Sequence, residues 1–394
     1  MKLLVTTNGR LFRTPDGIFY TPIVYDYGFF QRYLEIFDSV RLVAHVTEVE
    51  KAAPDWLRVD GHKLEIFPVI SPKGKIGYLK NYKAITQSLK IAIIDCDAAN
   101  LRIPDELAFQ LYRIIRQYSK IPVGIEVTSN SWDFFSPGST KGFLRPILRR
   151  WWDFQQKRLC KEADASCYVT KEAIQKRYAS GINKYTTYCS DVDIEQYCDD
   201  PYREYGDKPI TELRILHISG SISGKAKGHK ELVEALAMLK TKGYKFHCTL
   251  VGKGNLDSDI QEIVNVNDLD ITFAGTKKAI EIRELLLNHD MFVFPSYREG
   301  LPRVIVEAMA SGIMIVATAL DGIKELLPIE SLVEVRSSEQ LSAKIEHYLK
   351  NPMKMTKMSM INKSSSEDYR KVSLNRRRSD YYGTLHHLAY EIKK

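Results

Sequence analysis

Two glutamates, Glu299 and Glu307, are spaced to suit a ligand that carries both hydroxyls and negative charge. After Glu299 the chain reads Gly300, Leu301 and Pro302: the glycine permits a tight turn, and proline is favoured at the first position of a helix. A carboxylate accepts hydrogen bonds from neighbouring hydroxyls, and the free N–H groups of a helix start favour an anion. This chemistry suits a nucleotide sugar, with Glu307 on the ribose and Glu299 on the hexose.

The elements that must position these glutamates can be read from the apolar residues around them. The run Met291–Phe294 has the length of a buried strand. Apolar residues then recur at helical spacing over 302–311, which predicts a helix with one apolar stripe. Glu299 would lie in the connecting loop and Glu307 in the second turn of the helix. Taken alone, two such glutamates are far more often solvated side chains.

The stretch 292–312 resembles, nearly continuously, the E-x7-E signature of family 4 glycosyltransferases of the GT-B fold. The resemblance implies two Rossmann-like domains facing each other across a cleft. It also implies retaining transfer of a hexose-type sugar from a nucleoside diphosphate sugar, without a cofactor or a metal. A UDP-sugar is the favoured donor and a GDP-sugar the alternative. The implied acceptor is a hydroxyl of a glycan or lipid-linked molecule, in surface polysaccharide or glycoconjugate assembly.

A loop rich in Gly, Ser and Lys covers 219–229, directly after the strand-like run 213–218. Such a loop offers backbone N–H groups and flexible cations to a phosphate. In the resembling family an arginine and a lysine hold the diphosphate at this point, and Lys227-Gly228 matches the lysine. The alternative is a solvated, lysine-rich turn.

The second cation of this loop is not in its usual place, because Ser221 stands at the position of the family's arginine. Lys225 or Arg303 could supply that charge instead. In the front-face mechanism that the resemblance implies, the leaving diphosphate takes the proton of the acceptor. Lys227 and Arg303 would then stabilise the charge on the diphosphate while Glu299 orients the hexose.

Weaker donor candidates follow other strand-like runs. Thr276 and Lys277 end one run, at a point where the resembling family contacts the nucleobase through the main chain. Gly9 follows the first run and is a candidate beside the donor phosphates, with Gly17 and Gly28 as competitors. An ordinary turn glycine is at least as frequent at such positions.

Acceptor contacts are expected in the first half of the chain, where the sequence is least informative. Glu126 and Asp133 belong to a stretch that follows a strand-like run and should reach the cleft, so both are candidates. Neither belongs to a motif sharp enough to indicate a catalytic role.

A D-x-D motif, Asp95-Cys96-Asp97, ends an apolar run that is expected to form a strand over 91–95. Metal-dependent glycosyltransferases of the GT-A fold hold Mn²⁺ or Mg²⁺ with such carboxylates, and hard oxygen ligands suit those ions. The motif is frequent by chance, and a GT-A enzyme would need no second Rossmann-like half. We therefore expect no metal site.

Apolar runs alternate with amphipathic helical stretches in both halves of the chain, which predicts α/β architecture with parallel sheets. The expected parts are an acceptor-side domain over 1–190, a linker over 191–211, a nucleotide-sugar-binding domain over 212–375, and a helix over 376–394 that returns to the first domain.

Composition restricts the class of protein further. The net charge of +8 could serve nucleic acid, an anionic membrane or a diphosphate, but no nucleic-acid motif accompanies it. No apolar run approaches the ~20 residues of a membrane span, and six cysteines without CxxC spacing fit neither a zinc site nor a disulfide framework. The start of the chain is too short for a signal peptide, so a cytoplasmic protein is expected.

The stretch 143–154 interleaves arginines with tryptophans. A basic amphipathic helix of this kind can lie on an anionic membrane, here the inner face. The alternative is a helix of the first domain with solvated arginines.

Two other functions remain open at this point. A catalytically silent sugar-nucleotide-binding partner is suggested by Ser221 in place of arginine. A GT-B-fold epimerase would convert the nucleotide sugar with no acceptor present.

Overall fold

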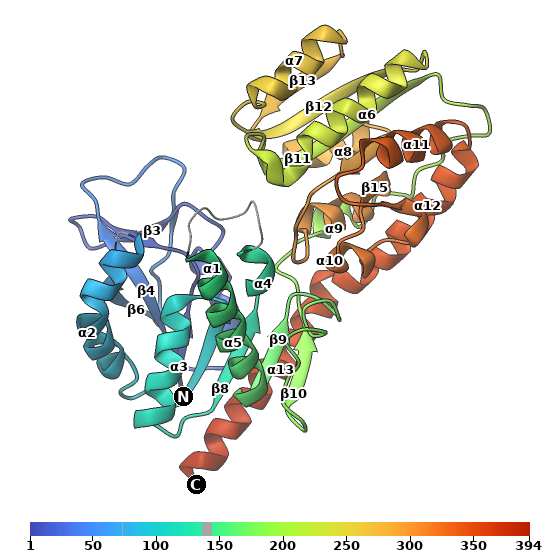
Figure 1. The fold of residues 1–394 in the computed structure, drawn as a ribbon. Coiled ribbons are helices and arrows are strands. Elements are labelled where there is room, and N and C mark those ends of the chain that lie inside the picture. Colours follow the sequence, from blue (N-terminus) through green and yellow to red (C-terminus); the bar gives the residue numbers. More distant parts are fainter. Residues whose placement is uncertain (73, 136–143) are drawn as a thin grey trace. The chain divides into compact units, whose positions relative to one another are not determined.

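The computed structural model describes residues 1–72, 74–135 and 144–394. The chain divides into two compact units (Figure 1). The first unit comprises Met1–Cys189 together with Asn375–Lys394, and the second comprises Ser190–Leu374. Each unit has an α/β architecture, as the alternation of the sequence predicts.

The first unit is built on a sheet whose described strands run in the order β10-β9-β8-β7-β1-β4-β2-β3-β5, with β6 paired to β4. The pairs from β10 through β4 to β6 are parallel, whereas β3 is antiparallel to both of its neighbours. The strands are β1 (Lys2–Thr6), β2 (Leu11–Arg13), β3 (Phe19–Thr21), β4 (Ser39–Glu48), β5 (Leu57–Arg58), β6 (Leu64–Ile70), β7 (Ala98–Ile103), β8 (Val123–Val127), β9 (Ala165–Tyr168) and β10 (Tyr185–Tyr188).

Helices cover both faces of this sheet because its strands are apolar on both sides. The helices are α1 (Tyr27–Leu34), α2 (Gly74–Ala92), α3 (Glu106–Tyr118), α4 (Ser131–Phe134), α5 (Arg145–Glu162) and the C-terminal part of α13 (Lys371–Lys393). Strand β8 shows the alternation directly: Val123, Ile125 and Val127 belong to the core beneath α2, α3 and α5. The intervening Gly124 and Glu126 face α13.

The second unit has a parallel sheet in the order β13-β12-β11-β14-β15-β16. Numbered from β11, this is the order 3-2-1-4-5-6 of a dinucleotide-binding Rossmann sheet. Its strands are β11 (Glu212–Ser221), β12 (Lys245–Lys253), β13 (Ile271–Gly275), β14 (Met291–Phe294), β15 (Met314–Thr318) and β16 (Leu332–Val333). The chain therefore reverses its direction of winding between β11 and β14, where such sheets bind ligands.

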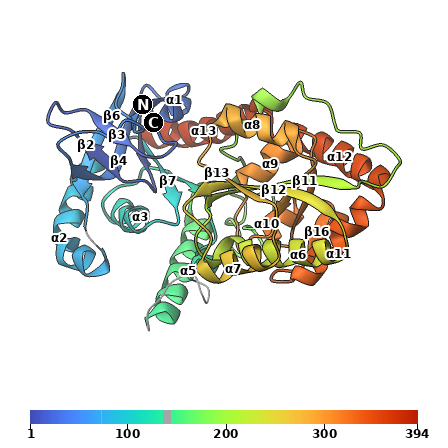
Figure 2. The same cartoon turned by 90° about the horizontal axis from the view of Figure 1, so that it is seen from above.

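Figure 2 shows helices on both faces of this second sheet, with α6, α7 and α11 on one face and α8, α9 and α12 on the other. The helices are α6 (His229–Thr241), α7 (Ser258–Val266), α8 (Ala279–Asn288), α9 (Arg303–Ala310), α10 (Asp321–Lys324), α11 (Ser338–Leu349) and α12 (Pro352–Ser366). The core between α6, α7, α11 and the sheet contains many buried aliphatic residues, among them Ile215, Leu236 and Val293.

The expectation of a strand over 91–95 is wrong. Helix α2 continues to Ala92, and the exposed Ile91 and Ile94 belong to its end and to the turn that follows it. The D-x-D motif therefore precedes β7 instead of following a strand, and Asp97 accepts a hydrogen bond from the backbone N–H of Lys2 at 2.7 Å. A short apolar run cannot by itself distinguish a strand from the last turn of a helix.

Two features are absent from the residues that the structure describes. None of their helices combines the length and the apolar character needed to cross a membrane. No group of three or more His, Cys, Asp or Glu side chains among them is arranged to hold a metal ion.

Candidate functional site

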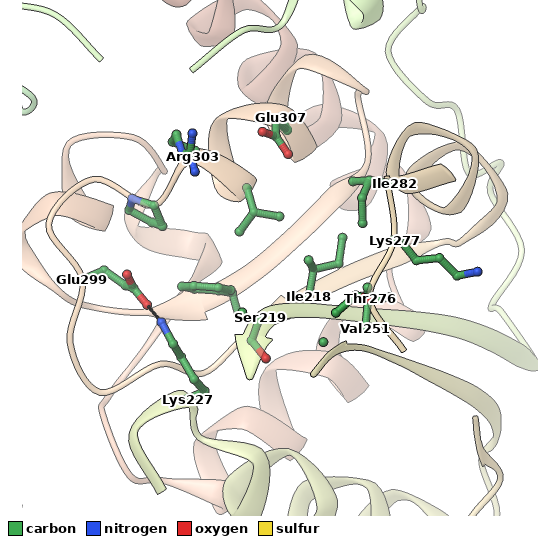
Figure 3. A pocket seen from close by; sticks show the side chains of 15 residues that line it. Ile218, Ser219, Lys227, Val251, Thr276, Lys277, Ile282, Glu299, Arg303 and Glu307 are labelled. Carbon is green, nitrogen blue, oxygen red and sulfur yellow. Dashed lines mark hydrogen bonds and ion pairs between the residues drawn. The ribbon is translucent and has the colours of Figure 1, made fainter. Parts of the chain in front are cut away.

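A cavity of about 440 Å³ opens at the carboxyl edge of the second sheet, around the point where the winding reverses (Figure 3). Ligands of doubly wound sheets bind at this position because the loops from the two halves of the sheet separate there. The cavity is lined by Ile218, Ser219, Gly220, Lys227, Val251, Gly252, Thr276, Lys277, Ile282, Phe294, Glu299, Pro302, Arg303, Val304 and Glu307.

Helix α9 supplies two of the charged groups. It begins at Arg303, directly after Pro302, and its buried stripe of Ile305 and Met309 turns Glu307 toward the cavity. Burial raises the pKa of Glu307, while the nearby Arg303 opposes this shift and Asp193 adds to it. A half-buried carboxylate of this kind can accept hydrogen bonds from a diol, and it meets less competition from water than a fully exposed one.

The loop after β11 supplies the cation. Lys227 ends a short 3₁₀ turn, and its Nζ lies 2.6 Å from Oε1 of Glu299. The same carboxylate oxygen accepts a hydrogen bond of 2.9 Å from the hydroxyl of Ser296. The two sequence-predicted residues are thus brought into direct contact, although they lie far apart in the chain.

A close backbone approach makes this contact possible. Gly228 has a φ of +72°, and a Cβ at this position would stand 2.0 Å from the carbonyl oxygen of Pro295. The N–H of Tyr297 donates to the carbonyl of Ala226 at 3.0 Å and joins the two loops. A residue with a side chain could adopt neither the dihedral angle nor the distance without strain.

The opposite side of the cavity is formed by the ends of β12 and β13. In Figure 3, Thr276 and Lys277 lie across the cavity from Lys227 and Glu299, with Glu307 on α9 between the two sides. The Lys277 ammonium is paired with Glu281 at 2.9 Å. One side of the cavity therefore carries the ion pair of Lys227 and Glu299, and on the other side the charge of Lys277 is paired with Glu281.

Several predicted donor residues do not line the cavity. Gly300 and Leu301 lie in the loop before α9, and Ser221 hydrogen-bonds to the backbone of Ser223 instead. The side chain of Lys225 lies outside what the structure describes. Gly9 belongs to the first unit, where it follows β1, and its role beside the donor phosphates stays a prediction.

Ser219 and Gly220, which were not expected at the site, line the cavity in place of Ser221. Strand β11 runs to Ser221, so the residues at the cavity belong to the end of the strand itself. The signal was present, since ligands of such sheets bind at carboxyl ends of strands, but the end of β11 was placed three residues too early.

Two histidines, His217 and His229, pack against each other beside this end of β11. The ring of His217 lies 4.9 Å from that of His229, and His229 Nε2 lies 3.4 Å from the hydroxyl of Ser219. Burial lowers the pKa of His217 to about 3 and also lowers that of His229. Both rings therefore remain neutral at physiological pH and add no positive charge to the cavity.

Glu126, the first acceptor candidate, was expected to reach the cleft, but the structure places its side chain in the interior of the first unit. Glu126 lies within β8, is 7% exposed, and forms an ion pair with Arg102. Its carboxylate also accepts hydrogen bonds from Tyr33 (3.0 Å), Asn100 (2.8 Å) and Tyr382 (2.9 Å). These contacts satisfy a buried charge inside the first unit, which is a structural role.

Asp133, the second acceptor candidate, lies in the short helix α4 of the first unit. It is half-buried and accepts a hydrogen bond of 2.7 Å from the side chain of Asn130. Its role toward an acceptor stays a prediction.

Comparison with known families adds an independent observation. Residues 208–365, which include every lining residue of the cavity, match the family "Glycosyl transferases group 1". Protein CapJ of Staphylococcus aureus is 24% identical over 326 residues, which is 82% of this chain and 80% of CapJ. The amylovoran biosynthesis glycosyltransferase AmsK of Erwinia amylovora is 32% identical over 123 residues, 29% of this chain and 30% of AmsK.

Solved structures are similar to this chain over nearly its whole length. The sucrose-phosphate synthase of Thermosynechococcus elongatus superposes with a TM-score of 0.68 at 14% identity, over 98% of this chain and 99% of that chain. HepE of Anabaena, in complex with UDP and glucose, superposes with a TM-score of 0.66 at 17% identity, over 98% of this chain and 100% of that chain. At these identities the likeness shows the fold, which is GT-B.

Proposed function

We propose that this glycosyltransferase, a GT-B protein whose second unit carries the group 1 family domain, transfers a hexose-type sugar with retention from a UDP-sugar to a hydroxyl. The acceptor in this proposal is a glycan or lipid-linked glycan in polysaccharide or glycoconjugate assembly. We place the reaction in the cytoplasm, at the inner face of the membrane. One observation carries the proposal: Lys227, Glu299, Arg303 and Glu307 line a single cavity at the reversal point of a Rossmann sheet.

The layout of the cavity supports a nucleoside diphosphate sugar. Lys227 and the N–H groups at the start of α9 would hold the diphosphate, and Glu307 would accept hydrogen bonds from the ribose. The nucleobase would lie toward Thr276 and Ile282, on the far side of the cavity. HepE, which shares the fold, was solved with UDP, and this favours uridine over guanosine.

The ion pair between Lys227 and Glu299 would make orientation of the sugar depend on binding of the diphosphate. An incoming diphosphate would draw the Lys227 ammonium toward its own oxygens, since it carries the larger negative charge. Glu299 would thereby be released to accept a hydrogen bond from the hexose. Donor binding and orientation of the sugar would then be coupled through one pair of side chains.

The proposed chemical step needs no protein base. The bond between the anomeric carbon and the diphosphate oxygen breaks while the acceptor oxygen attacks the same face, and the leaving diphosphate takes the acceptor proton. Lys227 and Arg303 would stabilise the charge that grows on the diphosphate, which is the largest contribution that the protein can make. The proposal includes neither a metal nor a cofactor.

The experiment that tests this function is a thermal-shift screen of the purified protein against UDP, GDP, ADP, CMP and their sugars, with and without EDTA. The expected result is a rise in melting temperature with UDP and UDP-sugars that EDTA does not change and that Glu307→Ala removes. No shift with any nucleotide would overturn the donor site. A shift that EDTA removes would mean a metal-dependent donor site.

Turnover separates this function from its alternatives. The glycosyltransferase releases UDP and forms a new glycosidic bond only when an acceptor is present. An epimerase would convert the UDP-sugar without an acceptor, and a silent binding partner would bind UDP without releasing product.

A further inference from the structure

The segment that precedes β11 packs against the helix that carries Glu307. Residues 190–211 belong to the second unit. The Nζ atom of Lys363, on α12, donates hydrogen bonds to the carbonyl oxygen of Tyr197 at 2.7 Å and to that of Ala310, the last residue of α9, at 2.6 Å. One ammonium group therefore holds the backbone of Tyr197 beside the last turn of α9, about one helical turn from Glu307.

The side chain of Tyr197 is buried, and its hydroxyl has no hydrogen-bond partner. Tyr197 is 0% exposed, and although the side chain of Gln196 is near its phenolic oxygen, no group lies in hydrogen-bonding position. Buried hydroxyls are nearly always hydrogen-bonded, because an unpaired one lowers the stability of the folded state. This hydroxyl is therefore a donor available to a neighbouring group.

Glu307 is the neighbouring group that can accept from it. Burial raises the pKa of Tyr197, and the nearby carboxylate of Glu307 raises it further. The other charged groups near the ring are Arg283 and Asp200, which form an ion pair with each other. The carboxylate of Glu307, in contrast, forms neither a hydrogen bond nor an ion pair with any residue that the structure describes.

We propose that Tyr197 is a positioning residue for Glu307. When the ribose of the donor enters the cavity, the hydroxyl of Tyr197 donates a hydrogen bond to the Glu307 carboxylate, which faces the cavity and accepts from the ribose (Figure 3). Tyr197 does not line the cavity itself, so it acts on the ligand only through Glu307. The inference rests on the proposed function, since it takes the ribose to be the ligand of Glu307.

Removal of the hydroxyl alone separates this role from a structural one. Tyr197→Phe deletes a group without a partner, so the melting temperature of the unliganded protein should stay the same or rise. The Kd for UDP, measured by calorimetry, should rise about tenfold, as expected for loss of one hydrogen bond to a charged group. In turnover with an acceptor, KM for the UDP-sugar should rise while kcat stays unchanged, because the ribose is remote from the reacting atoms.

The matched control is Tyr348→Phe in the same unit. Tyr348 is also buried, but its hydroxyl donates to the carbonyl of Glu330 at 2.9 Å. This variant should lower the melting temperature and leave the Kd for UDP unchanged. The two variants are thus expected to show opposite patterns of stability and binding.

Two further comparisons show whether Tyr197 acts through Glu307. Tyr197→Phe should bind 2′,3′-dideoxyuridine diphosphate, which lacks both ribose hydroxyls, as tightly as the unchanged protein does. In a double-mutant cycle, Tyr197→Phe should change the Kd for UDP little once Glu307→Gln is present. A full loss of affinity in either comparison would overturn the assignment of Tyr197 to Glu307.

The remaining outcomes distinguish this inference from the proposed function. Equal Kd values for UDP in Tyr197→Phe and the unchanged protein would overturn the inference and leave the donor site intact. A lower melting temperature of unliganded Tyr197→Phe would also overturn it, because the hydroxyl would then have a partner within the fold. Absence of UDP binding by the unchanged protein would overturn the proposed function and the inference with it.

Discussion

The ammonium of Lys227 and the carboxylate of Glu299 form an ion pair of 2.6 Å across two loops that begin at the ends of neighbouring strands. The side chains are 33% and 17% exposed, so water screens the pair in part and its contribution to stability is below about 1 kcal/mol. In the proposed reaction, the pair would hold both groups at the place where charge develops during transfer.

Replacing Lys227 by alanine is therefore expected to affect turnover more than stability. We expect kcat to fall roughly 10²–10³-fold, as when one preorganised donor of an oxyanion site is removed. The Kd for UDP should rise by a smaller factor, measured by calorimetry. Lys253→Ala, at an exposed lysine beside the cavity, is the control. Equal factors in kcat and in binding would contradict an electrostatic role in the transition state.

In the absence of a ligand, the ionised form of Glu307 should lower the free energy of unfolding of the protein. Its pKa is raised by burial, so the folded state holds the proton more tightly than the unfolded state, and stability falls as pH rises through that interval. At neutral pH, Glu307→Gln should raise the melting temperature by about 2–4 °C for each kcal/mol relieved, and should lose the shift caused by UDP. Glu284→Gln, at an exposed residue of α8, should change neither. A lower melting temperature of Glu307→Gln would refute this account.

Donor affinity should depend on pH through the same carboxyl group. Because the pKa of Glu307 is raised, the group takes up its proton at a higher pH than an ordinary glutamate, and the neutral form accepts ribose hydroxyls less well. Affinity for UDP should therefore fall as pH is lowered. The measurement is the Kd of the unchanged protein and of Glu307→Gln over the same pH range. Protonation of UDP affects both proteins equally, so parallel curves would exclude Glu307 as the titrating group.

Gly228 should tolerate no side chain. Gly228→Ala combines a φ of +72° with a Cβ that would stand 2.0 Å from Pro295 O, so a cost of about 3 kcal/mol is expected together with loss of UDP binding. Gly243→Ala is the matched control, because its φ of +84° is similar but no atom lies within 4 Å of the added Cβ. It should cost about 1 kcal/mol. Denaturant midpoints of the two variants measure the difference.

Removal of Glu126 should damage the first unit and spare the donor cavity. Glu126→Ala leaves Arg102 buried without its carboxylate, a change that typically costs 3–5 kcal/mol. At a temperature where the variant is still folded, its Kd for UDP should equal that of the unchanged protein. Asp133→Ala, at a half-buried residue, should destabilise much less. A variant of Glu126 with ordinary stability and lost acceptor turnover would restore the acceptor role.

The predictions that hold most fully are those that depend on local sequence. The α/β class with Rossmann-like parallel sheets is confirmed, as is the glycosyltransferase class. The strand Met291–Phe294 appears with the predicted bounds, and the helix starts at Arg303, one residue after the predicted start. Periodicity and turn residues determine these elements, because a short strand, a glycine and a proline leave few alternatives.

Distant segments determine what the sequence could not reveal. Glu126 looked accessible because it stands near the end of an apolar run, but α13, which follows it by more than two hundred residues, covers that side of β8 with Tyr382. The expected end of β11 was three residues too early. For this reason Ser221 was expected at the cavity, which Ser219 lines instead. The burial of Glu126 leaves no local pattern, since it arises from packing between elements that are distant in the chain.

Helix α13 also determines the order in which the two units can be completed during synthesis of the chain. It leaves the second unit at Leu374 and completes the first unit, where Tyr381 donates to Asn100 at 2.7 Å and Tyr382 to Glu126. Residues 375–394 therefore join the first unit only after the second unit has been synthesised, because they follow Leu374 in the chain. Until then, the side of β8 that carries Glu126 lacks its contact with Tyr382.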